Sequence, residues 1–159
     1  MPSKASARHF RDDSRGDEIG WISFGAFLII LGVIYVRTPN LIQEVRIFFS
    51  DFRLVEVFKN FWWFAPSTDH PVLYAAAEQF CYAFGVVQLG ILGLRFAKGS
   101  SIHRRAETLS SAVFWLGAGF LLSQLSQGIL SWLSFIAALV VLIGVSIIVS
   151  ALVLVFARQ

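Results

Sequence analysis

The chain has 159 residues, of which 57% are hydrophobic and only 14% are charged, whereas about a quarter of the residues in soluble domains are charged. No Asp, Glu, Lys or Arg occurs from Leu109 to Ala157, and a soluble domain of this size has too little interior to bury so much apolar surface. The net charge of +3 does not indicate a nucleic-acid-binding protein, because the basic residues flank apolar runs and form no single stripe. The single cysteine, Cys81, excludes an intramolecular disulfide and a cysteine-rich metal site.

The first 18 residues are polar, mixed in charge and without apolar periodicity, so they predict a mobile tail. The remainder, residues 19–159, is predicted to be one integral membrane domain. Its first apolar run, residues 20–36, is about long enough to cross a hydrocarbon core of ~30 Å at 1.5 Å per residue. No small-x-small cleavage pattern lies near its end, so we expect an uncleaved anchor helix, with Asn40 capping the next helix.

The segment after this run has a different pattern. Residues 41–54 place apolar side chains on one helical face and polar side chains on the other. Its charged residues would be costly at the bilayer centre, so we expect an amphipathic helix that lies in the membrane interface. The pattern fails after Leu54, and residues 54–68 are expected to be irregular or extended. Trp62 and Trp63 then fit a position at the membrane boundary.

Three further spans follow, at about residues 72–96, 109–125 and 129–156. Asp69 or His70 is positioned to cap the second span, with Pro71 in its first turn. The connection Ser123–Gly128 is short and polar, which makes the third and fourth spans antiparallel neighbours. The predicted fold is therefore all-α: a four-helix transmembrane bundle with an additional interfacial helix between spans one and two.

The orientation follows from the distribution of Lys and Arg. With the N-terminus in the cytoplasm, nine of these residues lie inside and four outside, and inverting the chain reverses the numbers. The positive-inside rule therefore predicts that both termini are cytoplasmic and that the protein lies in the cell membrane. The four-span form without a catalytic motif resembles small prokaryotic membrane proteins in general, and this resemblance assigns no site.

An acid in the second span is the most unusual feature of the apolar segments. Glu78 shares a helical arc with Tyr82, Gly85 and Gln88, so these side chains are expected to face other helices. Matching by depth predicts polar neighbours on the other spans, with Ser110, Ser111 and Ser150 near Gln88. The candidate intramembrane polar site comprises Glu78, Tyr82, Gln88, Ser123, Gln124 and Ser134.

This candidate site has two interpretations. Glu78 either holds helices together by hydrogen bonds or carries protons or cations, because intramembrane acids mark ion pathways in many proteins. Other chemistry has weaker support. Cys81 has no histidine within the spans to activate it, so a packed thiol is expected. No metal-binding or phosphate-binding motif occurs, and no cofactor is expected. The glycines at positions 20, 25, 32, 117 and 119 are interpreted as helix-packing points.

The loop between the second and third spans is basic, and cations beside a cytoplasmic membrane surface attract anionic lipid headgroups. Its charges also have a simpler explanation in setting topology alone. The candidate headgroup contacts are Arg95, Lys98, Arg104, Arg105, Trp62 and Trp63.

Three function classes remain from the sequence. The favoured one is a structural or accessory membrane protein, or a subunit of a membrane assembly, that contacts lipids and either itself or other membrane proteins. The alternative is a small proton- or solute-conducting transporter or channel that uses Glu78. The third is a lipid-modifying enzyme. The sequence shows no evident acid–base pair for such chemistry, so we do not expect enzymatic activity.

Overall fold

The computed structural model of the chain describes residues 4–156, with side chains described from residue 20 onward except at residues 57, 58 and 61. Within this range the chain forms five helices and two strands. In order these are α1 (Lys4–Arg37), α2 (Leu41–Ser50), β1 (Phe52–Phe58), β2 (Phe61–Pro66), α3 (Pro71–Ala97), α4 (Ile102–Ser126) and α5 (Trp132–Phe156).

Four helices are long and apolar enough to cross a membrane: the part of α1 from Gly20 to Arg37, and the whole of α3, α4 and α5. The predicted end of the first span at residue 36 and both ends of the second, 72–96, agree with the ends of α1 and α3 to within one residue, whereas α1 itself begins at Lys4. The helix that contains the predicted third span is longer than that span, because α4 includes the polar residues before Leu109 and begins at Ile102.

The predicted fourth span starts too early, because a helix stop separates α4 from α5. Gly128 has a φ of 70°, and its N–H donates to the carbonyl of Leu125 while that of Ile129 donates to the carbonyl of Gln124. This pair of bonds is the Schellman ending of a helix. Residues 129 and 130 therefore belong to the connection, and α5 begins at Trp132.

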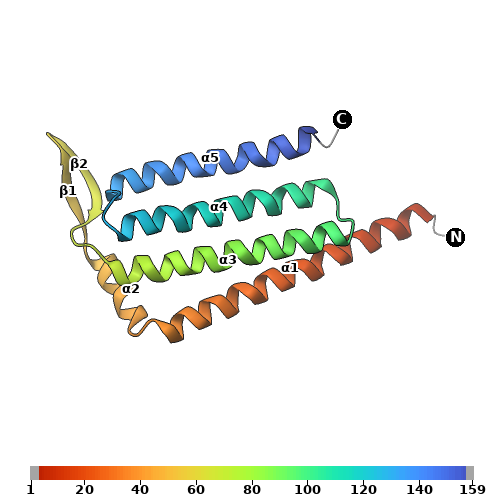
Figure 1. Ribbon diagram of the computed structural model, residues 1–159, viewed down its shortest axis with the longest axis horizontal. Coiled ribbons are helices and arrows are strands. Elements are labelled where there is room, and N and C mark those ends of the chain that lie inside the picture. Colours follow the sequence, from red (N-terminus) through yellow and green to blue (C-terminus); the bar gives the residue numbers. More distant parts are fainter. Residues whose placement is uncertain (1–3, 157–159) are drawn as a thin grey trace.

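The four long helices lie side by side in a row (Figure 1). α1 packs on α3, α3 on α4, and α4 on α5. Neighbours in the row run in opposite directions, so the beginning of α1 and the end of α5 lie at the same end of the molecule. The antiparallel contact of α4 and α5 confirms the expectation from their short connection. The row differs from a closed four-helix bundle, because α1 and α5 form its two edges.

Glycines permit the closest contacts in this row. A Cβ atom at Gly85 of α3 would lie 2.7 Å from Leu116 Cδ2 of α4, and one at Gly119 of α4 would lie 3.0 Å from the Tyr82 ring. Gly117 of α4 is similarly closed off by α5. The packing role expected for residues 117–119 is therefore confirmed. At positions 20, 25 and 32 no described atom of this chain lies within 4 Å of the expected Cβ position, so these glycines are not packing points between helices of the row.

The other end of the molecule carries α2 and an antiparallel hairpin (Figure 1). The helix ends at Ser50, four residues earlier than predicted, and the strands make the fold mostly helical instead of all-α. The strands pair Leu54 with Phe64 and Val55 with Trp63, and Asn60 takes a positive φ of 67° in the turn. Aromatic and β-branched residues around a turn asparagine favour such a hairpin. The expectation of an extended segment after Leu54 is thus correct for most of its length.

The first helix also differs from the prediction for residues 1–18. α1 begins at Lys4, so most of the expected irregular tail is helical. A helix can form from charged and polar residues. The absence of apolar periodicity indicates only that such a helix has no apolar face with which to pack against other elements. The mobility and cytoplasmic location of this segment stay predictions, as does the interfacial position of α2.

Candidate functional site

The acid that the sequence singles out lies on α3 in a half-buried position. Among the described residues Glu78 takes part in no hydrogen bond or ion pair. Tyr82, one turn along, packs its ring against the backbone of Gly119. Cys81 is buried and free, as expected for a packed thiol.

The predicted polar partners of Glu78 form local hydrogen bonds instead. The hydroxyl of Ser123 accepts a bond of 3.0 Å from the Gln127 amide, and the hydroxyl of Ser134 lies 2.9 Å from that of Ser131. Gln124 contributes its backbone carbonyl to the end of α4. These bonds close the connection between α4 and α5 and leave Glu78 outside the network. Whether Glu78, Tyr82, Gln88, Ser123, Gln124 and Ser134 act together stays a prediction.

Gln88 lies in a different setting, where polar groups from three helices meet. Its side chain is only 8% exposed and has no hydrogen-bond partner in the described part of the chain. It lines a groove of about 450 Å³ that α1, α3 and α4 form near the end of the row that holds the α3–α4 loop. Three hydroxyl-bearing residues also line this groove, namely Ser23, Thr108 and Ser111. Of the three serines expected near Gln88, only Ser111 shares the groove; Ser110 donates instead to the carbonyl of Ser146.

Arg95 lines the same groove two turns of α3 beyond Gln88. Its guanidinium donates to the carbonyl of Arg104, while its Nε atom is buried and has no hydrogen-bond partner among the described residues. Glu107 also lines the groove, but its Oε1 lies 3.1 Å from Nδ1 of His103 and its side chain is 58% exposed. The carboxylate therefore lies exposed beside His103, and no ion pair joins it to Arg95 among the described residues.

The remaining basic residues of the loop are arranged separately. Lys98 is exposed and lies outside the groove lining. The guanidinium carbon of Arg105 lies 4.7 Å from the centroid of the Phe96 ring, a cation–π contact. At the opposite end of the molecule, Trp62 and Trp63 have exposed side chains on β2. Headgroup contact by these residues stays a prediction.

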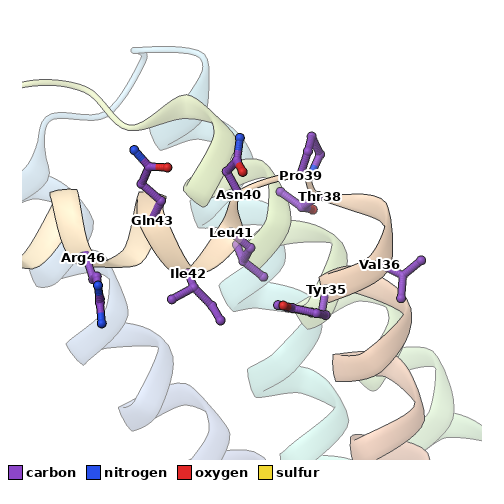
Figure 2. A pocket seen from close by; sticks show the side chains of 9 residues that line it. All are labelled: Tyr35, Val36, Thr38, Pro39, Asn40, Leu41, Ile42, Gln43 and Arg46. Atoms are coloured by element: carbon purple, nitrogen blue, oxygen red, sulfur yellow. The ribbon is translucent and has the colours of Figure 1, made fainter.

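Two further hollows lie toward the α2 end of the molecule. One, of about 690 Å³, is at the bend between α1 and α2. Figure 2 shows Leu41 and Ile42 on one side of α2 there, with Asn40 and Gln43 pointing to the other. Asn40 stands at the first position before α2 but makes no capping bond with its side chain, so its predicted capping role is wrong. The other hollow, of about 630 Å³, lies between α1 and α3.

A polar cluster that the sequence did not predict joins α2 to the start of α3. The Asp51 carboxylate accepts bonds of 2.7 Å from both the backbone N–H and the hydroxyl of Thr68, and it lies 3.2 Å from Nε2 of His70. His70 is 5% exposed and occupies the position before α3, yet its ring makes no capping bond. The cluster closes a loop of 19 residues, so no periodic pattern could have indicated it.

These bonds determine the ionisation of Asp51. Donation from the Thr68 hydroxyl, followed by that from the Thr68 N–H and then the proximity of His70, holds the pKa of Asp51 below its ordinary value of 3.8. The ionised carboxylate therefore stabilises the fold at pH values above 3.8. This contribution is lost as the pH falls through the lower pKa of the folded state.

We expect Asp51→Asn to lower the thermal unfolding midpoint in detergent near neutral pH. The difference from the wild-type chain should shrink as the pH falls below the ordinary pKa of the carboxyl group. The matched control is Asp69→Asn, which removes the same charge from an exposed neighbour that takes part in no described bond. A midpoint difference that stays constant down to the most acidic pH would contradict this assignment.

Comparisons with known proteins return no relative. No known family, no curated protein and no solved structure matches this chain. Within the described residues, no group of three or more His, Cys, Asp or Glu side chains is placed to hold a metal ion. What distinguishes the groove around Gln88 and Arg95 from the other two hollows is that its lining includes a glutamine only 8% exposed and an arginine whose buried Nε atom has no described acceptor.

Proposed function

We propose that the protein is a multi-pass integral membrane protein of the cell membrane, with four crossings and both termini in the cytoplasm. In this arrangement α2 and the hairpin lie at the outer surface, and the α3–α4 loop lies at the inner one. We propose that its role is structural or accessory, within an assembly of itself or other membrane proteins.

The observation that carries the proposal is the apolar surface along the edges of the row. α5 has no charged residue over its 25 residues, and only Phe135 and Ser146 of it are buried within the chain. In the span of α1 from Gly20 to Arg37, only Ile34 is buried. In water such surfaces would drive aggregation, whereas lipid or a neighbouring transmembrane helix solvates them.

Orientation is tested by labelling two matched cysteines with a membrane-impermeant maleimide. Lys59 at the hairpin turn and Lys98 in the α3–α4 loop are both exposed and lie at opposite ends of the row. In a Cys81→Ser background, we expect Lys59→Cys to react in intact cells and Lys98→Cys to react only after permeabilisation. The reverse result would contradict the orientation, and labelling of both in intact cells would contradict membrane crossing between them.

The accessory role is tested by native mass spectrometry of the full chain in mild detergent. A retained second copy or another membrane protein supports it. The transporter alternative rests on Glu78, and the described polar side chains near α3 supply no bonded partner for that acid. A lone chain that conducts protons in liposomes, and loses conduction in Glu78→Gln, would replace the accessory role with that alternative.

A further inference from the structure

We propose that the groove between α1, α3 and α4 binds one anionic phospholipid, with its phosphate at Arg95 and its ester groups at the level of Gln88. This inference rests on the proposed membrane crossing of the helices. It does not depend on which side of the membrane the groove faces, or on the accessory role.

The order of side chains along α3 matches the order of chemical groups in a phospholipid. Arg95, Gln88, Phe84 and Phe80 follow each other at spacings of seven, four and four residues, which places them near one face of a helix. At 1.5 Å per residue, Gln88 lies about 10 Å from Arg95 along the axis. The polar layer of one leaflet adds about 5–8 Å to the hydrocarbon core, which is shorter than this separation, so Gln88 lies at or inside the boundary of the core when Arg95 lies in the polar layer. The charged group, the amide and the rings thus follow the order of phosphate, ester and acyl chain.

Both neighbouring helices also carry aromatic rings beyond their polar groove residues. On α1, Ser23, Phe24 and Phe27 line the groove, and Phe27 follows Ser23 by about one turn. The Phe27 ring contacts Phe84 at a centroid distance of 5.9 Å and Phe80 at 5.4 Å. On α4, Thr108 and Ser111 lie in the lining. Trp115 follows Ser111 by about one turn of α4 without lining the groove, and its ring lies 5.1 Å from that of Phe84, so aromatic rings of all three helices meet beyond the polar side chains.

The groove holds polar atoms without partners. A buried guanidinium N–H without an acceptor destabilises a fold, and an unpartnered amide that reaches open volume remains free to bind a ligand. Gln88 is 8% exposed and unpartnered among the residues described, and the Nε atom of Arg95 is buried without an acceptor. A lipid phosphate supplies an anionic acceptor for Arg95, and a lipid ester carbonyl supplies an acceptor for the Gln88 amide.

The charge of the groove favours an anionic ligand because the one carboxylate in its lining, Glu107, is exposed and screened by solvent. Its contact with His103 and its exposure place that carboxylate at the rim. A free phosphate shares the charge of a lipid headgroup, but it would use neither Gln88 nor the aromatic end of the groove. An anionic amphiphile uses both, and for this reason we assign the groove to a phospholipid.

The test uses the full chain in mild detergent with phosphatidylglycerol, and native mass spectrometry measures the fraction of chains that retain one lipid. We expect Arg95→Gln to reduce retention about tenfold, which is the effect of losing one charge-assisted hydrogen bond. The matched control, Lys98→Gln, removes the same charge from the same loop outside the groove and should change retention less than twofold.

The variant Gln88→Leu distinguishes a loss of lipid binding from a loss of folding. Because the Gln88 amide has no partner to lose, the apolar variant should unfold at the same temperature as the wild-type chain or higher, yet retain several-fold less lipid. Glu107→Gln, at an exposed rim position, should retain lipid at least as well as the wild-type chain. Inorganic phosphate at millimolar concentration should leave the bound lipid in place.

Three results would overturn the assignment. Equal losses in Arg95→Gln and Lys98→Gln would mean that the loop attracts lipid by charge alone. Displacement by inorganic phosphate would mean that the groove is a small-anion site. Unchanged retention in Gln88→Leu would remove the amide from the site. Failure of the membrane placement is distinguishable, because it would appear in the maleimide labelling.

Discussion

Phe48→Ala is expected to lower the free energy of unfolding by about 2–4 kcal/mol, somewhat less than the 3–5 kcal/mol typical of a fully buried phenylalanine. The Phe48 ring lies at centroid distances of 5.3 Å from His70, 6.2 Å from Tyr74 and 5.8 Å from Trp132. These rings belong to the start of α3 and the start of α5. The Phe48 side chain of α2 therefore contacts two helices of the row, α3 and α5.

The adjacent phenylalanine provides the control for this prediction. Phe49 is 71% exposed, and its one described ring contact is with Phe48 itself. Phe49→Ala removes the same number of atoms from the same helix. It therefore changes the helix propensity by the same amount as Phe48→Ala but removes little packing. Unfolding in detergent, followed by circular dichroism, measures both variants. Equal losses would show that Phe48 does not anchor α2.

Gly85→Leu is expected to destabilise the contact of α3 with α4 by about 1–3 kcal/mol, the usual cost of forcing extra atoms into a packed site. A Cβ at this position would lie 2.8 Å from Leu116 Cγ and 3.2 Å from the Leu116 backbone nitrogen. The backbone atom cannot move without shifting α4. The two helices must therefore separate or slide, and the grooves on either side of α3 change with them.

The control for this substitution lies two turns along the same helix. Gly93 is exposed and has nothing within 4 Å of its expected Cβ position, so Gly93→Leu adds the same side chain without a clash. Thermal unfolding midpoints in one detergent compare the two variants directly. A midpoint for Gly85→Leu that equals that of Gly93→Leu would contradict the close approach of α3 and α4.

The sequence alone was sufficient for the long helices, for reasons that act locally. Runs of apolar residues determined where the four long apolar segments lie, because their hydropathy depends on composition and not on neighbours. The boundaries failed only where other forces act. The polar residues before Leu109 belong to the first turns of α4, which hydropathy does not detect. The positive φ of Gly128 ends α4 before Ile129 and Leu130, two apolar residues that hydropathy assigns to the next span.

The candidate sites depended on which helices are neighbours, and periodicity does not carry that information. Gln88 and Arg95 were each identified from sequence, but their shared groove requires α1 and α4 to lie on either side of α3. The network predicted around Glu78 assumed that equal depth brings side chains together. The described bonds of Ser123 and Ser134 are instead with residues three or four positions away in the chain.

What the sequence by itself determined is the apolar character of four helices, the amphipathic character of α2 and the end of α4 near Gly128, because each depends on residues within a few turns. Only the tertiary structure decided the row of helices, the bonds of Asp51 to Thr68 and His70, and the groove at Gln88. Each of these brings together residues far apart in the chain. Their contact depends on how closely the helices approach, and the shapes of facing residues, such as Gly85 and Leu116, determine that distance. Hydrophobicity alone does not specify how closely two helices pack.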